Sequence, residues 1–361
     1  MNILVYNLAA EYAGAMTILE NFYNQAVSYP DESIQWYFVV STEKLESKKN
    51  IKVISEPWVK RSWLHRLYYD NFIIQRIVKE KRIDQVYSMQ NMPIKRINAK
   101  QVVYLHQSLQ FSPVKFSLFD KEQRGYAIRQ KIVCNLYRKN LKHADYIIVQ
   151  TNWFKDAVVK WIPFDEKNIM VVNPRVSVDE HFLQKEYCLT EPVFFYPAGD
   201  GMHKNHEIIL DACKRLQDEG IKNYKVIFTL DRVTALYSEK IAQRIEKEKL
   251  NIEFIGIVSK EEVFENYSHS VLLFPSYLET FGLPLLEARM MKAIIMASDM
   301  PFCHEALEHY KNAYFFAIDD DERLAGLMKM VIKGELPYYE VDEDIRNQKK
   351  KTEIECLLEN C

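Results

Sequence analysis

The sequence predicts an α/β protein of two domains, each built on a parallel sheet with helices on both faces. The 361 residues are 48% hydrophobic, which is enough for two cores of ordinary size. Short apolar runs without strict alternation, which are typical of strands buried on both faces, recur along the chain. Longer amphipathic stretches separate these runs, and strands alternating with helices predict parallel sheets.

The expected elements follow from these runs in chain order. In the first half we expect strands at 3–6, 36–40, 102–105 and 146–149, and a helix at 15–26. In the second half we expect strands at 193–196, 226–230, 252–255, 271–274 and 293–297, with helices at 207–218, 235–249, 285–291 and 324–332.

The pattern is interrupted over 173–187, where a proline and many polar residues occur. We therefore expect a first domain at 1–180 and a second domain at 181–340. The charged tail at 341–361 is expected to end in a helix at 349–360 and to return toward the first domain.

Charge is distributed unevenly along the chain. Residues 1–190 contain 27 Lys and Arg against 19 Asp and Glu, a net +8, whereas residues 191–361 contain 21 against 31, a net −10. This asymmetry indicates either that the first half meets an anionic partner or that the two halves attract each other.

The cysteines and the apolar runs bear on location. The six cysteines form no CxxC pair and show no regular spacing, which argues against a disulfide framework or a zinc site and fits a reducing cytoplasm. The sequence begins with a strand-like run and contains no apolar run of membrane-spanning length. We expect a cytoplasmic protein, and attachment to the inner face of the cell membrane stays open.

The stretch PSYLETFGLPLLEA, residues 275–288, places two glutamates around a short apolar loop. The expected strand ends before this stretch, and Pro284 is a natural first residue of a helix, so the loop joins a strand to a helix. Ligands bind at such carboxyl ends of parallel strands. Gly282 lets the backbone approach a ligand closely, and the free N–H groups of a helix start suit phosphate.

The two glutamates have both a functional and an ordinary interpretation. Glu279, at the mouth of the loop, is placed to hold hydroxyls of a sugar, and Glu287, in the expected first helical turn, is placed to accept from both hydroxyls of a ribose. However, the helix dipole favours a glutamate in a first turn, and a loop glutamate is usually solvated. Spacing alone leaves both interpretations open.

The run FIGIVSKEEVFENYSHSVLLFPSYLETFGLPLLEARMMKAIIMASD, residues 254–299, resembles the donor-binding half of glycosyltransferase family 4, a large family of GT-B fold. The shared pattern is a Gly-containing strand end, a helix, Pro-Ser, Glu, seven residues, Glu-Ala, and a strand ending near Asp. VVYLHQSLQF at 102–111 and YPAGDGMHKNHE at 196–207 resemble sugar-nucleotide enzymes that build bacterial surface polysaccharides. The resemblance is strong over 191–310 and thinner over 1–190.

The resemblance implies a fold, a reaction and partners. The fold is GT-B, with two Rossmann-like domains whose parallel sheets face a central cleft. The first domain binds the acceptor, and the second binds a nucleoside-diphosphate sugar, UDP- or GDP-linked. The transfer retains the anomeric configuration and needs no cofactor and no obligate metal. An acceptor glycan on a lipid carrier fits the basic first half.

Two alternatives to this transferase stay open. One is a GT-B sugar-nucleotide epimerase, or a synthase with a soluble acceptor. The other is a nucleotide-sugar-binding partner subunit without catalysis. No nucleic-acid-binding motif occurs, so a nucleic-acid partner is not expected.

The resemblance also assigns roles residue by residue. Glu287 matches the glutamate that binds the nucleotide ribose, and Glu279 matches the one that contacts the donor sugar. Lys204, in HKN, matches a cation on the diphosphate, which gains negative charge as the glycosidic bond breaks. The expected catalytic residues are His106, Lys204 and Glu279. The expected donor-binding residues are Gly14, Lys204, Asn205, Gly256, Ile257, Val258, Glu279, Thr280, Phe281, Gly282, Leu283 and Glu287.

Several of these assignments have their own context. His106 follows an expected strand, where it either faces the donor sugar and acceptor or only caps the strand. Gly14 is expected to open the first helix, without a GxGxxG fingerprint. The family usually has an Arg shortly before Lys204, but this sequence has AGDGMH there, so Arg175 or His203 would have to substitute.

Two charged stretches allow further interpretations. The acidic run DDDE at 319–322 precedes an expected helix, so helix capping explains it better than a metal site, and we expect no metal. The stretch at 58–82 repeats apolar residues at helical spacing among basic ones. Its apolar stripe either packs against the domain core or lies on an anionic membrane surface.

Overall fold

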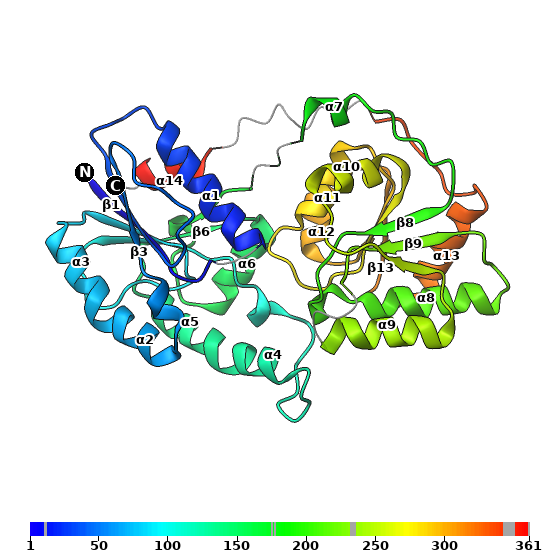
Figure 1. Ribbon diagram of the computed structural model, residues 1–361, viewed down its shortest axis with the longest axis horizontal. Helices are drawn as coiled ribbons and strands as arrows, with labels where there is room; N and C mark the ends of the chain where they lie inside the picture. The colour runs from blue at the N-terminus through cyan, green and yellow to red at the C-terminus, as the bar shows by residue number, and fades with distance from the viewer. Residues whose placement is uncertain (11–12, 175, 177, 232–235, 342–350, 360–361) are drawn as a thin grey trace. The chain divides into compact units, whose positions relative to one another are not determined.

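The computed structural model describes residues 1–361 except 11–12, 175, 177, 232–235, 342–350 and 360–361 (Figure 1). The chain divides into two units. Unit 1 contains Met1–Gln110, Arg129–Asn173 and Lys349–Cys361, and unit 2 contains Phe111–Ile128 and Pro174–Gln348. The segment Phe111–Ile128 thus belongs to unit 2 although the sequence before and after it belongs to unit 1.

Unit 1 contains a seven-stranded parallel sheet in the order β3-β2-β1-β4-β5-β6-β7. The strand order reverses between β1 and β4, so the carboxyl ends of these two strands form a switch point at which ligands bind in open α/β sheets. Its strands are β1 (Asn2–Asn7), β2 (Gln35–Val40), β3 (Ile51–Ser55), β4 (Gln85–Ser88), β5 (Lys100–Tyr104), β6 (Tyr146–Val149) and β7 (Ile169–Val171). Its helices are α1 (Ala13–Ser28), α2 (Trp63–Tyr68), α3 (Ile74–Glu80), α5 (Cys134–Leu141), α6 (Asn152–Trp161) and α14 (Glu353–Glu359).

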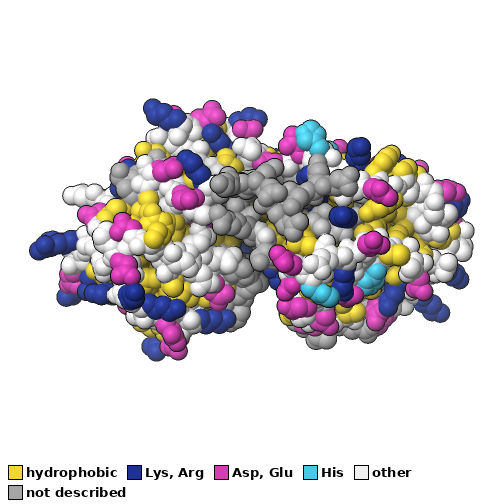
Figure 2. Space-filling view, turned by 90° about the horizontal axis from the view of Figure 1, so that it is seen from above, with side chains coloured by type: hydrophobic (Ala, Val, Ile, Leu, Met, Phe, Trp, Pro, Cys, Tyr) yellow, Lys and Arg dark blue, Asp and Glu magenta, His cyan; other side chains and the backbone are white. Residues whose placement is uncertain are grey.

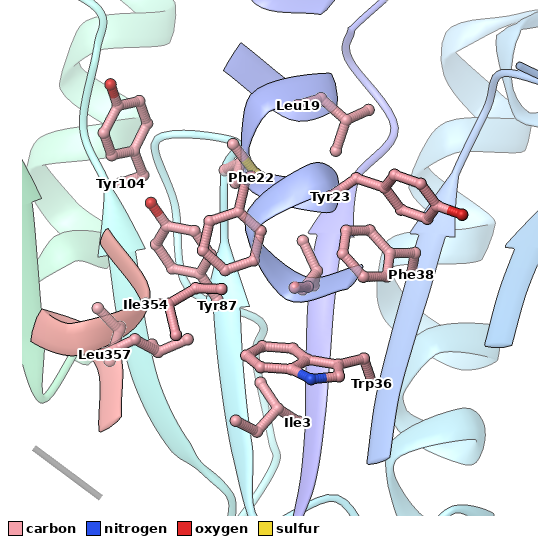
Figure 3. Close-up of a cluster of buried hydrophobic side chains, with 14 of the residues drawn as sticks. Ile3, Leu19, Phe22, Tyr23, Trp36, Phe38, Tyr87, Tyr104, Ile354 and Leu357 are labelled. Atoms are coloured by element: carbon pink, nitrogen blue, oxygen red, sulfur yellow. The ribbon is translucent and has the colours of Figure 1, made fainter. Parts of the chain in front are cut away.

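The core of unit 1 lies on both faces of this sheet. Because successive side chains of a strand point to opposite faces, Ile3 and Val5 of β1 pack on one side and Leu4 and Tyr6 on the other. The first side also holds Phe22 of α1 (Figure 3), together with Trp36, Tyr87, Ile354 and Leu357.

The carboxyl-terminal helix α14 is part of this core and lies beside α1 (Figure 1). The Tyr87 hydroxyl donates to Oε2 of Glu353 at 3.0 Å, and the Gln85 side chain donates to the Leu357 carbonyl at 3.2 Å. Burial raises the pKa of Glu353 to about 7. The end of the chain is therefore fastened to unit 1 by apolar packing and by a buried carboxyl group.

Unit 2 contains a six-stranded parallel sheet in the order β10-β9-β8-β11-β12-β13, with its switch point between β8 and β11. Its strands are β8 (Val193–Tyr196), β9 (Lys225–Phe228), β10 (Ile252–Phe254), β11 (Val271–Phe274), β12 (Ile295–Ser298) and β13 (Ala313–Phe316). Its helices are α4 (Arg124–Ile128), α7 (Glu180–Leu183), α8 (His206–Asp218), α9 (Leu236–Glu248), α10 (Lys260–His269), α11 (Leu283–Met290), α12 (Pro301–Ala306) and α13 (Asp321–Ile332).

The two parallel-sheet α/β units confirm the predicted class of fold, and every expected strand is present within two residues of its predicted ends. Four strands, β3, β4, β7 and β13, were not predicted. β7 has only three residues and β4 is the mixed run QVYS, so neither forms an apolar run that stands out from its surroundings.

The aromatic and basic stretch after β3 forms α2, a π-helical turn at Tyr69–Ile73, and α3. Its apolar side chains differ in burial. Val59, Tyr69, Ile74 and Val78 are buried in the core, whereas five others are more than half exposed: Trp63, Leu64, Leu67, Tyr68 and Phe72. Of the two interpretations left open by the sequence, packing against the core therefore holds for part of this stripe only.

Candidate functional site

Two charged side chains meet at the carboxyl edge of the sheet in unit 2. Lys204 lies in the loop after β8, and Glu279 lies in the loop after β11, the neighbouring strand. The Lys204 Nζ lies 2.5 Å from Oε1 of Glu279, and the two side chains are only 23% and 18% exposed. The switch point thus carries a largely buried ion pair that solvent can still reach.

Hydrogen bonds from neighbouring residues fasten the two loops to each other. The Tyr277 backbone N–H and the Ser276 hydroxyl both lie within hydrogen-bonding distance of the His203 carbonyl, at 3.0 and 3.1 Å. The Ser276 hydroxyl also lies 2.8 Å from Oε1 of Glu279, to which it can donate. On the other loop, the Tyr196 hydroxyl donates to the Lys204 carbonyl at 2.7 Å. The ion pair is therefore held by bonded backbone on both sides.

Asn205 shapes the turn that follows Lys204. Its backbone is left-handed, with φ 55°, and it stands at the N-terminus of α8. Its side chain donates to the Ile318 carbonyl at 2.9 Å. Asn tolerates this conformation better than most residues, so Asn205 allows the chain to turn from the Lys204 loop into the helix.

The ion pair determines the charge of the groups around it. Burial opposes ionisation of Glu279, but the charge of Lys204 and the hydrogen bonds from Lys204 and Ser276 outweigh it, so the pKa of Glu279 is lowered. Burial and the neighbouring Lys204 lower the pKa of His203 to about 4. His203 is consequently neutral near pH 7 and does not supply the charge of the missing arginine. Arg175, the other candidate, lies outside the described residues.

The loop after β11 enters α11 through Gly282, whose backbone is left-handed at φ 85°. A Cβ at this position would be strained by the left-handed backbone and would lie 3.0 Å from Cδ1 of Leu285, a tight contact, so glycine is favoured here. The helix begins at Leu283 and Pro284 is its second residue. Thr280 is partly exposed, whereas the side chain of Phe281 is buried, which leaves only its backbone for a ligand.

The expectation that Glu287 lies in the first helical turn is wrong. Because α11 begins one residue before the proline, Glu287 is the fifth helical residue, one turn further along. Its Oε2 accepts from the Tyr267 hydroxyl at 3.3 Å. Burial raises the pKa of Glu287, although the charge of Lys260 and the hydrogen bond from Tyr267 act to lower it.

The segment Gly256–Val258 follows β10. Gly256 has φ 74°, and a Cβ there would lie 3.0 Å from Oδ1 of Asp231. The side chain of Ile257 is 85% exposed, so this loop presents an apolar side chain to solvent.

In unit 1, His106 follows β5 by two residues. Its backbone N–H donates to Oδ1 of Asn91 at 2.8 Å, and the Gln107 N–H donates to the same oxygen at 2.9 Å. Burial lowers the pKa of His106 to about 4, so its ring is neutral near pH 7. His106 lines a small cavity of about 20 Å³ with Asn7 and Tyr104. Gly14 is the second residue of α1.

Sequence reasoning missed the contribution of Phe111–Ile128 to the loop that carries Lys204. The Met202 N–H donates to the Tyr126 hydroxyl at 3.3 Å, and the Tyr126 ring meets the His203 ring edge-on with centroids 6.4 Å apart. Phe116 stacks on Tyr126 at 5.0 Å. No sequence signal reveals this contact, because the segment lies in the first half of the chain.

Two absences concern the described residues only. Among them, no cluster of three or more His, Cys, Asp or Glu side chains could hold a metal ion. Within the acidic run, Asp320 caps α13 by accepting from the Arg323 N–H at 2.8 Å. No helix in this part of the chain is both long and apolar enough to cross a membrane.

Comparisons with known proteins bear on both units. Residues 179–352 match the family model described as glycosyl transferases group 1. Over 191 residues the chain is 26% identical to the O-antigen chain mannosyltransferase RfbU of Salmonella typhimurium, covering 52% of this chain and 51% of that protein. The chain therefore matches about half the length of this curated relative.

The solved structures that resemble this chain share its fold at low identity. The lipopolysaccharide outer core galactosyltransferase WaaB, in its apo form, has a TM-score of 0.65 and 17% identity, covering 94% of this chain and 92% of that one. HepE of Anabaena, in complex with UDP and glucose, has a TM-score of 0.63 and 15% identity, covering 92% and 90%.

The segment that matches the group 1 family contains Lys204, Glu279 and Glu287, the three charged residues described above. The structural likenesses extend over both units. The shared fold therefore shows the GT-B architecture, and the family match is confined to residues 179–352.

Proposed function

We propose that the chain is a retaining glycosyltransferase of family 4 that moves a sugar from a nucleoside-diphosphate donor, UDP- or GDP-linked, to a glycan acceptor. The observation that carries this proposal is the Lys204–Glu279 ion pair at the switch point of unit 2, within the segment that matches the family. A diphosphate needs a cation and a sugar needs hydrogen-bond acceptors, and this pair provides both at one place.

Lys204 acts on the leaving group. As the glycosidic bond breaks, the nucleoside diphosphate gains negative charge, and a fixed ammonium group stabilises it. In the structure, Lys204 is paired with Glu279. When the donor binds, Lys204 turns to the diphosphate oxygens, and Glu279 accepts hydrogen bonds from sugar hydroxyls instead. The pKa of Glu279, lowered chiefly by Lys204, keeps the carboxylate ionised while the two side chains are paired.

The rest of the donor is bound by the loop and helix after β11. The backbone of Phe281, Gly282 and Leu283 lies at the start of α11, where N–H groups and the helix dipole favour a phosphate group. Glu287, one turn later, accepts from the ribose hydroxyls. Gly256–Val258, and Gly14 of unit 1, complete the donor-binding set in this proposal.

His106 of unit 1 orients the donor sugar. In a retaining transfer the acceptor arrives on the face from which the diphosphate departs, so the sugar must be held while positive charge develops at its anomeric carbon. A neutral imidazole can accept from or donate to one sugar hydroxyl. The lowered pKa of His106 supports a neutral ring. No metal or other cofactor has a role in this scheme.

The proposed acceptor is a glycan on a lipid carrier, in the synthesis of a bacterial surface polysaccharide. The mannosyltransferase of O-antigen chains and the galactosyltransferase of the lipopolysaccharide core, both similar to this chain, favour this class. The net +8 of residues 1–190 favours work at the anionic inner face of the cell membrane. On the face shown in Figure 2, the Lys and Arg side chains of unit 1 are interspersed with Asp and Glu, so the attraction to an anionic membrane comes from scattered charges there.

The experiment that tests the function combines binding and transfer. The protein is heated with each of a panel of UDP- and GDP-sugars, because a ligand that binds only the folded state raises the melting temperature. The sugar that stabilises it is then supplied with glycan acceptors, and the product and its anomeric configuration are analysed. Lys204→Ala should abolish most transfer, whereas the surface control Lys214→Ala should not. Conversion of the donor without any acceptor would indicate an epimerase instead.

A further inference from the structure

Unit 1 contains a cavity of about 160 Å³ that the proposed donor chemistry does not use. It lies where the strand order reverses, against Tyr6 of β1 and Gln90 after β4. Residues from α2 and the π-helical turn form one wall, and residues from α5 form another. The lining residues are Tyr6, Arg66, Leu67, Asp70, Asn71, Gln90, Met92, Pro93, Ile94, Lys95, Leu136 and Asn140.

This cavity is separate from the one beside His106. Tyr6 and Gln90 line the larger cavity, whereas their chain neighbours Asn7 and Met89 line the small cavity with His106. Because neighbouring residues of a strand point to opposite faces, the two cavities lie on opposite sides of the sheet edge. A ligand in the larger cavity would therefore leave the His106 side free.

One end of the cavity is polar and its groups are held in place. Arg66 Nε donates to Oδ2 of Asp70 at 2.8 Å, the Tyr6 hydroxyl donates to the other oxygen of Asp70, and Arg66 also donates to the Gln90 side chain. The Arg66 and Asp70 side chains are still 29% and 28% exposed. A ligand can therefore meet a guanidinium donor and a carboxylate acceptor that are already oriented.

The remaining walls are mostly apolar, with Asn71, Lys95 and Asn140 as their polar members, and they limit what fits. Leu67, Met92, Pro93, Ile94 and Leu136 surround the polar end. A cavity of about 150 Å³ holds one six-membered ring. Because Arg66 is paired with Asp70, the polar end offers a donor and an acceptor side by side, and a neutral ring with hydroxyl groups can donate to Asp70 and accept from Arg66. Hydroxyls for the polar end and C–H groups for the apolar walls are the features of a single sugar ring.

An exposed apolar ridge begins at the mouth of this cavity. Its side chains come from α2 and the π-helical turn, and each is more than half exposed: Trp63, Leu64, Leu67, Tyr68 and Phe72. Leu67 belongs to both the ridge and the cavity wall. Contiguous exposed apolar side chains of this kind mark an interaction surface. An apolar chain attached to a ring in the cavity could continue along the ridge.

We propose that this cavity binds one neutral sugar ring of an amphiphilic glycoside, with the apolar aglycone lying along the ridge. The inference rests on the proposed function, since the amphiphile would be the lipid-linked acceptor, and it adds a glycan subsite on the sheet face opposite His106. Arg66 and Asp70 recognise the ring hydroxyls, and Leu67 and Leu136 pack against the ring.

The test is calorimetric titration of the full chain, without donor, with methyl and octyl glycosides of glucose, galactose and mannose, the octyl compounds below their micelle concentrations. At least one octyl glycoside should bind about 10-fold or more tightly than its methyl counterpart, because the chain buries apolar surface on the ridge. Leu136→Trp, which fills the cavity, should remove binding of both. Ile132→Trp adds the same bulk to an exposed residue one turn earlier, outside the lining, and should leave binding unchanged.

Two further variants distinguish contacts with the sugar ring from contacts with the octyl group. Asp70→Asn should weaken the methyl and octyl glycosides alike, because it touches the ring. Phe72→Ala, on the ridge but not in the lining, should weaken only the octyl glycosides. Absence of binding by every glycoside, or equal effects of Leu136→Trp and Ile132→Trp, would overturn the inference. Binding that persists in a chain unable to transfer sugar would instead contradict the proposed function alone.

Discussion

The carboxyl edge of unit 2 and the core of unit 1 each contain a glutamate that is largely removed from solvent. The pKa values of these two glutamates are shifted in opposite directions. Glu279 lies 2.5 Å from Lys204, and its pKa is lowered despite burial. Among the described residues, the Glu353 side chain accepts a hydrogen bond from the Tyr87 hydroxyl, and burial raises the pKa of Glu353 to about 7. Burial alone raises the pKa of a carboxyl group, whereas a paired cation and hydrogen bonds to the charged form lower it. At Glu279 the cation and the hydrogen bonds outweigh burial, and at Glu353 burial prevails.

The largest effect on activity is expected when the cation paired with Glu279 is removed, by changing Lys204 to Ala. Lys204→Ala should lower kcat by about 100- to 1000-fold, because the leaving diphosphate loses a fixed charge. Donor affinity should fall less, since the charge matters most in the transition state. The pKa of Glu279 should rise toward the behaviour of Glu353. Steady-state kinetics over a pH series measure both effects.

Lys214 provides the matched control for this variant, since it is exposed and paired with Asp218 on α8. Lys214→Ala should leave kcat unchanged. A loss confined to KM in Lys204→Ala would contradict a role in stabilising the leaving group.

The second prediction concerns Glu353 and replaces it with a side chain that cannot ionise. Glu353 has a folded pKa of about 7 against an ordinary value of 4.5, so the unfolded chain loses this proton first. Its contribution to stability is present below pH 4.5 and is lost as pH rises to about 7. Glu353→Gln keeps an acceptor for Tyr87 without a titrating group. It should therefore stabilise the protein at pH 8 by about 3 kcal/mol relative to the native chain.

Urea denaturation at pH 5 and pH 8 measures this difference. The gain should be small at pH 5, where Glu353 is mostly protonated in the folded protein. An equal effect of Glu353→Gln at both pH values would mean that the group does not titrate in this range.

The third prediction concerns His106, a neutral group at the carboxyl edge of unit 1. His106→Ala should lower the transfer rate by about 100-fold, or roughly 2.7 kcal/mol in the barrier, because one sugar hydroxyl loses its partner. The bare nucleoside diphosphate should bind as before, since the proposed contacts of the nucleotide come mainly from unit 2. Transfer kinetics and calorimetry together test this. A variant with native turnover would leave His106 as a strand cap.

The fourth prediction uses Glu287, whose pKa is raised by burial as that of Glu353 is. If Glu287 binds the ribose, Glu287→Ala should weaken donor binding by roughly 1.5–3 kcal/mol, the value of a lost hydrogen bond to a charged group. The fold should remain intact, because the hydrogen bond from Tyr267 to Glu287 is long, at 3.3 Å. Calorimetric titration with the donor gives the affinity, and circular dichroism checks the fold. Unchanged affinity would restrict Glu287 to a structural role.

The sequence predicted the parts of the site that are local. The strand before Glu279 and the turn at Gly282 follow from an apolar run, a glycine and a proline within a few residues. The bond between Lys204 and Glu279 was not predicted, because they are 75 positions apart and a motif assigns roles without contacts. The same holds for Tyr126, which reaches the Lys204 loop from the first half of the chain.

The cavity of unit 1 was not predicted for a similar reason. Its lining comes from β1, from α2 with the π-helical turn, from the segment after β4 and from α5. Each segment alone has an ordinary amphipathic pattern. Helical periodicity left open whether the stripe at 58–82 is buried. It could not separate buried Ile74 and Val78 from exposed Leu67 and Phe72, because the π-helical turn shifts the register.

The smallest effect is expected at the exposed ridge, where charges are screened by solvent. The full chain should bind vesicles containing anionic lipid, with an attraction of about 1 kcal/mol for each Lys or Arg that reaches the surface, and binding should weaken with salt. Trp63 is 72% exposed at the start of the ridge, so Trp63→Ala should reduce vesicle binding without changing stability. Vesicle sedimentation at low and high salt measures this. Equal binding to neutral vesicles would show that the apolar ridge binds membranes without the basic charges. Absence of binding to both kinds of vesicle would leave attraction between the two halves of the chain as the explanation of the charge asymmetry.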